Sequence, residues 1–224
     1  MDLDLRITEK QDLFIHSEAF ETLFGGAAGG GKSYGQLVDA LIYALTYEKS
    51  KQIIFRRTFP DLERSIIRTS MELYPRQIAS YNSSKHTWTF QNGSIIDFGY
   101  IDNENDVYQY QSAEYDVIRF DELTHFTEYM YTYMISRCRG ANGYPKHIKS
   151  STNPGGVGHV WVKERFIDIG KYGEVHECRL ETGEKTTRLF IPSFVTDNKF
   201  LMENDPDYVK RLDALPEKER KALK

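Results

Sequence analysis

Residues 22–47 read TLFGGAAGGGKSYGQLVDALIYALTY and carry the strongest structural signal in the chain. The stretch begins with a short apolar run at positions 22–24, which a cluster of glycines follows. Beyond the glycines, apolar residues return at helical spacing, at positions 37, 40, 41, 44 and 45. The stretch therefore predicts a strand, a glycine-rich loop and a helix, one after another.

The glycine-rich loop fits the pattern G-x-x-x-x-G-K-[ST]. In such a loop backbone N–H groups surround phosphate oxygens, the lysine reaches the β and γ phosphates, and the final hydroxyl binds Mg²⁺. The helix that follows adds its positive N-terminal end. A glycine-rich turn without function is the alternative, but the strand before and the helix after are the context that a phosphate loop requires. We therefore expect ATP and Mg²⁺ to bind at this loop, which consists of Gly26, Ala27, Ala28, Gly29, Gly30, Gly31, Lys32 and Ser33.

A second apolar run ends on two carboxylates. Residues 116–120 read DVIRF, and Asp121 and Glu122 follow. A magnesium–phosphate site needs an aspartate at a strand end, so we expect Asp121 and Ser33 to bind the metal. The adjacent Glu122 points elsewhere and is the expected general base for an attacking water. An acidic strand end is common by itself, but together with the phosphate loop it favours hydrolysis over binding alone.

The rest of the chain predicts strands and helices in alternation. Residues 52–57, 147–152 and 187–192 are strand candidates, and residues 61–79, 127–139, 160–169 and 207–224 have helical patterns. Residues 86–98 alternate around Asn92-Gly93, a strong signal for a β-hairpin. The alternation indicates an α/β fold with a mainly parallel sheet. We expect residues 1–224 to form a single P-loop NTPase domain, with a central sheet flanked by helices and an inserted β-hairpin.

Composition excludes several other classes of protein. The 224 residues include 29 Lys and Arg against 33 Asp and Glu, so the formal net charge is −4. The apolar content of 40% is that of a folded protein, and no apolar run approaches the roughly 18 residues of a membrane helix. The N-terminus lacks the apolar core of a secretion signal, and Cys138 and Cys178 make no disulfide framework. We therefore expect a cytoplasmic protein that does not bind a membrane.

Several motifs in order resemble the large terminase subunit of tailed bacteriophages. They are TEKQDLF, FGGAAGGGKS, FRRTFPDLERS, YDVIRFDELTHF, SRCRG, STNPGGVGHVWVKERF and IPSFVTDN, which together extend over nearly the whole chain. The resemblance implies an ATPase of the ASCE type that drives double-stranded viral DNA through a portal protein into a preformed capsid in the host cytoplasm. It also implies a small terminase subunit as a partner, and a homo-oligomeric ring on the portal formed by chains that are monomeric in isolation.

The resemblance assigns further roles to single residues. Ser151, Thr152 and Asn153 resemble the coupling motif that links hydrolysis to DNA movement, although a bland polar loop explains this segment equally simply. Gln11 resembles the glutamine that recognises adenine, with a solvated side chain as the alternative. The resemblance also implies that a complete large terminase has two domains, an ATPase and a nuclease that follows it. We expect the present chain to be the ATPase domain alone, without nuclease activity, and a linker to begin near residues 207–224.

The chain departs from the family pattern in its arginines. Its phosphate loop contains none, and Gln111-Ser112 stand where other terminases place an arginine before a glycine. An arginine that neutralises transition-state charge must therefore come from elsewhere. We expect Arg137 or Arg139 of a neighbouring subunit to supply it, with Arg56 and Arg57 as the next candidates.

Positive residues are concentrated around the predicted coupling motif. Between positions 137 and 165, six Lys and Arg stand against the single acid Glu164. Such an excess suits contact with phosphate backbones without reading their sequence, although charge runs are usually solvated surfaces. From this segment the expected DNA contacts are Lys146, Lys149, Lys163 and Arg165.

Three alternative functions are weighed against a DNA-translocating ATPase. A P-loop kinase for a small molecule would need an acceptor pocket with a mobile lid, and it would not need Glu122 beside Asp121. Another nucleotide-dependent nucleic-acid translocase or helicase would share the same motifs. An interaction protein without catalysis disagrees with the intact Lys32, Asp121 and Glu122.

Overall fold

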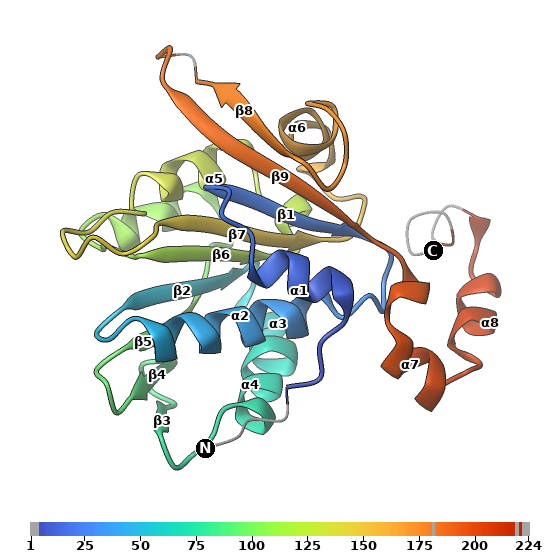
Figure 1. Cartoon of the computed structure of the whole chain (residues 1–224), viewed down its shortest axis with the longest axis horizontal. Helices are drawn as coiled ribbons and strands as arrows, with labels where there is room; N and C mark the ends of the chain where they lie inside the picture. The colour runs from blue at the N-terminus through green and yellow to red at the C-terminus, as the bar shows by residue number, and fades with distance from the viewer. Residues whose placement is uncertain (1–4, 181, 218–219, 221–224) are drawn as a thin grey trace.

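A nine-stranded β-sheet forms the centre of the molecule, and helices cover both of its faces (Figure 1). The computed structural model describes residues 5–180, 182–217 and 220. Within this part of the chain the strand order is β3-β4-β5-β2-β6-β7-β1-β9-β8. The strands are β1 (Glu21–Gly26), β2 (Lys51–Arg56), β3 (Ala79–Asn82), β4 (Thr87–Phe90), β5 (Ile95–Tyr100), β6 (Val117–Asp121), β7 (His147–Thr152), β8 (Val175–Arg179) and β9 (Lys185–Ser193).

Six neighbouring strands, from β5 to β9 in the sheet order, are parallel. Their carboxyl ends therefore lie at one edge of the sheet. At this edge Asp121 pairs in register with Ser151, and Gly25 pairs with Thr152. The predicted α/β fold with a mainly parallel sheet is confirmed, and the parallel arrangement brings the phosphate loop, the acidic pair and the predicted coupling motif together.

Two apolar layers hold the helices on the sheet. On one face α2 and α4 pack around Leu37, Leu41 and Trp88, and on the other face α5 and its neighbours pack around Phe120 and Phe166. The helices are α1 (Glu9–Ile15), α2 (Lys32–Thr46), α3 (Phe59–Leu62), α4 (Arg68–Leu73), α5 (Glu128–Ile135), α6 (His159–Val162), α7 (Lys199–Asn204) and α8 (Tyr208–Asp213). Shorter 3₁₀ or π turns are η1 (Glu63–Ile67), η2 (Glu104–Tyr110), η3 (Leu123–His125), η4 (Lys163–Ile167) and η5 (Val195–Asp197).

The region between β2 and β6 differs from its prediction at one point. The helix predicted over 61–79 ends with α4 at Leu73, because Tyr74 precedes Pro75 and takes an extended backbone conformation. The chain then forms β3, which pairs with β4. The predicted hairpin is confirmed as β4 and β5, which are antiparallel and joined by a turn that contains Gly93 at a φ of 83°.

Helix α1 and strand β8 are among the elements that had no expectation from the sequence. Helix α1 precedes the first strand, and Thr8 and Gln11 form a reciprocal capping box at its start. Strand β8 pairs antiparallel with β9 at the edge of the sheet. The tail predicted as one helix over 207–224 contains the short helix α8, and several of its last residues lie outside the described part. In the described part of the chain, no helix is long and apolar enough to span a membrane.

Candidate nucleotide and catalytic site

The phosphate loop turns tightly between β1 and α2. Gly26, Gly29 and Gly31 have φ angles of 137°, 77° and 71°, which side chains other than glycine rarely adopt. A Cβ on Gly26 would also lie 2.1 Å from the carbonyl oxygen of Ser193. The loop therefore passes close to the end of β9 and needs glycine for both space and backbone conformation.

Position 30 has no room for a side chain larger than that of glycine, because of one close contact. An added Cβ would lie 2.0 Å from Ser193 Oγ, whereas the Ser193 Cβ is 3.3 Å away. We predict that Gly30→Ala lowers the free energy of unfolding by about 1–3 kcal/mol, the usual cost of overpacking. The double variant Gly30→Ala/Ser193→Ala should recover most of this loss, since it removes the closest atom. Urea unfolding would measure both, and equal losses in the two variants would contradict this explanation.

Lys32 folds back over the loop at the start of α2. Its Nζ donates hydrogen bonds to the carbonyl oxygens of Ala27 (2.5 Å) and Gly26 (3.5 Å). Burial lowers the pKa of Lys32 to about 8, while the nearby carboxylates of Glu122 and Asp121 act in the opposite direction. A cavity of about 190 Å³ lies beside it and is lined by Ala28, Gly29, Gly30, Gly31, Lys32, Ser33, Tyr34, Glu122 and Asn153.

Asp121 is buried at the end of β6, where three side chains from other elements bind it. Its Oδ1 accepts hydrogen bonds from Ser33 Oγ (2.8 Å) and Ser151 Oγ (2.5 Å). Its Oδ2 accepts from Arg56 Nε (2.7 Å) and Nη2 (2.6 Å). Oxygen atoms are the ligands that Mg²⁺ prefers, so the convergence of Ser33 and Asp121 fits the metal that the sequence predicts.

Glu122 lines the cavity in a rare backbone conformation. Its φ of 60° lies in the left-handed region, which residues other than glycine rarely adopt. Its Oε2 and Oε1 accept hydrogen bonds from the backbone N–H (3.1 Å) and Nδ2 (3.0 Å) of Asn153. Burial, and then the charge of Asp121, raise the pKa of Glu122 above its ordinary value. This carboxylate is therefore held in place and is more basic than a solvated one.

The predicted coupling residues contact the acidic segment one by one. Ser151 binds Asp121, and Asn153 binds Glu122, as described above. Thr152 Oγ1 accepts from the backbone N–H of Thr124 (3.1 Å) and lies 2.9 Å from its hydroxyl. Gln36, which sequence patterns did not reveal, donates to Ser151 Oγ at 2.8 Å. The end of β7 and the segment after β6 thus form one hydrogen-bonded unit.

Gln11 lies beside the phosphate loop, although both ends of its amide bind the protein. Nε2 donates to the carbonyl oxygen of Gly31 (2.7 Å), and Oε1 accepts from Thr8 N (2.8 Å). A second cavity of about 310 Å³ includes Gln11 and Tyr34 in its lining. Asn198 also lines this cavity and donates to the carbonyl oxygen of Gly29 (2.6 Å). The adenine role of Gln11 stays a prediction, because both ends of its amide already bind the protein.

Arg137 and Arg139 lie far from the phosphate loop of their own chain. The backbone of both residues bonds to that of Tyr115, which precedes β6, whereas the loop adjoins the other end of this strand. Arg137 packs over the ring of Tyr133, and Arg139 forms an exposed ion pair with Glu114. Six residues of strand correspond to about 20 Å, so neither arginine can reach the phosphates of its own chain. Arg56, placed second by the sequence, is the arginine that lies in the site.

The predicted DNA-contacting residues do not form one surface, and for two of them the prediction is wrong. Lys149 has a side chain that is 4% exposed and pairs with Asp39 (2.8 Å). Arg165 is 12% exposed and binds the buried Glu21 (2.7 Å). Side chains that are largely enclosed and already bound to an ionic partner are not available to a DNA backbone.

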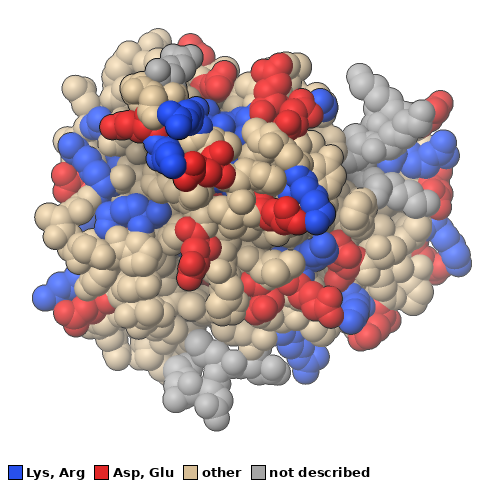
Figure 2. All heavy atoms as spheres, turned by 45° about the horizontal axis from the view of Figure 1, so that its top comes forward, with Lys and Arg blue, Asp and Glu red and all other residues tan. Residues whose placement is uncertain are grey.

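The other two predicted contacts lie apart from each other. Lys146 pairs with Asp116 (3.0 Å) at the edge away from the phosphate loop, and Lys163 is half exposed and pairs with Asp168 (2.7 Å). On the face drawn in Figure 2, basic and acidic side chains are interspersed rather than segregated. The positive run in the sequence therefore does not become a positive patch on this face.

Known proteins share both the fold and the sequence pattern of this chain. The family described as "Phage terminase large subunit" matches residues 18–224, whereas no curated protein sequence matches. The large terminase of a thermophilic bacteriophage, in complex with ADP, has a TM-score of 0.72 at 16% identity, over 97% of this chain and 52% of that chain. The large terminase ATPase domain of Thermus phage P74-26 has a TM-score of 0.69 at 15% identity, over 99% of this chain and 93% of that chain.

These matches settle the fold and the family. The likeness to solved structures confirms the α/β fold with its mainly parallel sheet, and the chain spans about half the length of the terminase that was solved with ADP. The family match extends over most of the chain and includes every site residue described above except Gln11. The chain belongs to the phage terminase large subunit family.

Proposed function

We propose that this chain hydrolyses ATP and uses the free energy to move double-stranded viral DNA into a procapsid. The observation that carries the proposal is the position of the Glu122 carboxylate, which follows Asp121 directly. It lines the cavity beside Lys32 and accepts hydrogen bonds from Asn153. A protein that only binds nucleotide does not need a base at this position. Hydrolysis does, because the attacking water must lose a proton.

Each residue of the site has a separate role in hydrolysis. Lys32 and the backbone N–H groups of the loop bind the phosphates. Mg²⁺, when held by Ser33 and Asp121, supplies charge neutralisation at the β and γ phosphates. Glu122 accepts the proton of the attacking water, for which its raised pKa is suited. Because Asn153 follows β7 directly, any movement of β7 changes the position of this base, and hydrolysis can thereby be linked to motion.

The proposal includes the partners of a packaging motor. We expect double-stranded DNA, a portal protein and a small terminase subunit to bind the motor in the host cytoplasm. We also expect a homo-oligomeric ring on the portal, formed by chains that are monomeric in isolation. Lys163 is the one of the four predicted lysine and arginine contacts that we retain for DNA, since its side chain is half exposed.

Replacing Lys32 by Ala is expected to weaken the binding of ADP by about 10–100-fold. This range corresponds to the roughly 1.5–3 kcal/mol of a hydrogen bond to a charged group. Titration calorimetry with ADP measures the effect. Lys171→Ala is the matched control, because Lys171 is 79% exposed and lies outside the cavity lining. An unchanged affinity in Lys32→Ala would remove this lysine from the phosphate site.

The proposed function is tested by identifying the molecule that accepts the phosphoryl group of ATP. ATP turnover should produce inorganic phosphate and should rise when linear duplex DNA is added. A kinase for a small molecule would instead respond to a hydroxyl-containing acceptor and would phosphorylate it. Stimulation by single-stranded nucleic acid alone would favour a helicase, and either result would contradict the proposal.

A further inference from the structure

Helix α2 presents polar side chains to the sheet on three successive turns. Ser33 donates to Asp121, and Gln36 donates to Ser151 Oγ and to the carbonyl oxygen of Phe120 (both 2.8 Å). One turn further on, the Asp39 carboxylate accepts hydrogen bonds from two cations of the sheet. The side of α2 that meets β6 and β7 is therefore joined to them by directional bonds as well as by apolar packing.

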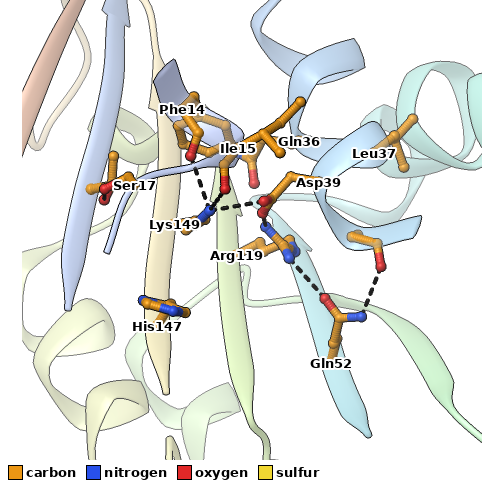
Figure 3. Close-up of polar contacts among 12 residues, drawn as sticks. Phe14, Ile15, Ser17, Gln36, Leu37, Asp39, Gln52, Arg119, His147 and Lys149 are labelled. Carbon is orange, nitrogen blue, oxygen red and sulfur yellow. Dashed lines mark hydrogen bonds and ion pairs between the residues drawn. The ribbon is translucent and has the colours of Figure 1, made fainter. Parts of the chain in front are cut away.

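The bonds of Asp39 belong to a buried cluster of four side chains, which Figure 3 draws. We call Asp39, Gln52, Arg119 and Lys149 the Asp39 cluster. Asp39 Oδ1 accepts from Lys149 Nζ (2.8 Å), and Oδ2 accepts from Arg119 Nη1. Arg119 Nη2 donates to Gln52 Oε1 (2.8 Å), and Gln52 Nε2 donates to the carbonyl oxygen of Ala40 (2.9 Å) on α2. All four residues are buried.

Every charged member of the Asp39 cluster lies on an element that also carries a site residue. Arg119 precedes Asp121 by two residues, so both side chains leave β6 on the same face. Lys149 precedes Ser151 on β7 in the same way. Asp39 follows Lys32 by seven residues, which places it about 10 Å along α2. The cluster thus links the helix of the phosphate loop to the strands of the acidic pair and the coupling motif.

Stability alone does not explain such a cluster. Buried ion pairs often contribute little to stability compared with well-packed apolar residues, because desolvation offsets their attraction. The cluster also contains two cations and one anion, which is more charge than a neutral pair requires. Charged bonds with fixed geometry do, however, prevent one element from sliding along another. Position is therefore the property that this cluster can supply.

We infer that the Asp39 cluster is a positioning device, which fixes α2 against β6 and β7 so that Ser33, Asp121 and Ser151 converge on one metal position. The inference rests on the proposed function, since it assigns Mg²⁺ to Ser33 and Asp121. Loss of the cluster should move Asp121 relative to Ser33. The phosphate loop and Lys32 are continuous with α2, so they should keep their own geometry.

The test compares the binding of ADP with and without Mg²⁺. In Asp39→Asn, affinity for ADP in EDTA should stay close to that of the parent. The affinity gained on adding Mg²⁺ should fall by about 10–100-fold, the usual effect of changing a residue that supports metal ligands. A purely structural role would lower the unfolding temperature without changing this Mg²⁺-dependent gain.

Two further variants make the test independent of folding defects. Lys149→Met keeps the side-chain volume, leaves Asp39 paired with Arg119 and should show the same loss of the Mg²⁺-dependent gain. Glu21→Gln is the matched control. Glu21 is 1% exposed, and its partners Arg165, Arg188 and Tyr131 lie on η4, β9 and α5 rather than on α2. Each variant is measured at the same interval below its own unfolding temperature.

Three outcomes decide the inference. Selective loss of the Mg²⁺-dependent gain in Asp39→Asn and Lys149→Met supports it. A parental gain in Lys149→Met overturns it, and so does an equal loss in Glu21→Gln. If Asp39→Asn does not fold, Lys149→Met decides alone. A parent protein that binds ADP with Mg²⁺ but releases no phosphate would contradict the proposed function, whereas the titration would still test the cluster.

Discussion

Replacing Glu122 by Gln is expected to lower ATP turnover by about 10²–10⁴-fold, the usual contribution of a general base. The glutamine has the size of the glutamate and can still accept a hydrogen bond from Asn153, but it cannot accept the proton of the attacking water. Binding of ADP should therefore stay close to that of the parent. Steady-state phosphate release and titration calorimetry measure the two quantities separately.

Glu128→Gln is a suitable control for this variant. Glu128 begins α5 a few residues further along the chain, and its side chain is 56% exposed and outside the cavity lining. Turnover should be unchanged in this control. If Glu122→Gln also retains the turnover of the parent, another group activates the water and the assignment of the base is wrong.

Loss of the neutralising arginine is expected to have the largest effect, about 10³–10⁵-fold on turnover. We propose that Arg137 or Arg139 provides it to a neighbouring subunit, because both lie at the edge of the sheet away from their own phosphate loop. Both arginines follow the end of α5 at Ile135, so each is replaced separately to find which of them acts. Isolated chains should then be poor ATPases, and turnover should rise with assembly.

Mixing two inactive variants tests this arrangement. Assemblies that contain both Glu122→Gln chains and Arg137→Ala (or Arg139→Ala) chains should regain turnover that neither variant has alone. The gain arises where an intact catalytic site meets an intact arginine of its neighbour. If both arginine variants hydrolyse ATP normally when assembled, the cation lies elsewhere. Arg56 is then the first candidate, because it already binds Asp121 within the same chain.

Residues with a local signature could be predicted from the sequence. The phosphate loop follows from the glycines, because backbone conformation and space require them at particular positions. The meeting of Asp121 with Ser33 follows from topology, since parallel strands bring their carboxyl ends to one edge. Gln36 has no such signature. It contacts Ser151 only because α2 crosses β7, which is a property of the packed fold.

The prediction of DNA contacts from the run of positive residues was wrong for Lys149 and Arg165, because the sequence does not reveal which side chains are enclosed. Lys149 is bound by Asp39, 110 residues away, and Arg165 by Glu21, 144 residues away. Neither partner is visible from the local pattern around residues 137–165. A run of positive residues therefore indicates a possible surface only after each member has been tested for a buried partner.

The sequence did not predict three elements, namely α1, β3 and β8. Strand β8 alternates between exposed and half-buried residues, so it lacks the apolar pattern of a core strand. Helix α1 has seven residues and begins with a capping box rather than with an apolar run. Strand β3 follows Pro75 in a segment whose apolar spacing also fits a helix. For β3 and β8 the pairing strand, and not the local sequence, determines the structure.

In the proposed reaction water attacks ATP at this site, and duplex DNA promotes the attack. Hydrolysis in water enriched in oxygen-18 tests it most directly, with the isotope content of released phosphate measured by mass spectrometry in the presence and absence of linear duplex DNA. Attack by water predicts that each released phosphate carries at least one oxygen-18 atom and that release is faster with DNA. Phosphate that appears only on an organic acceptor, with no labelled inorganic phosphate under either condition, would contradict it.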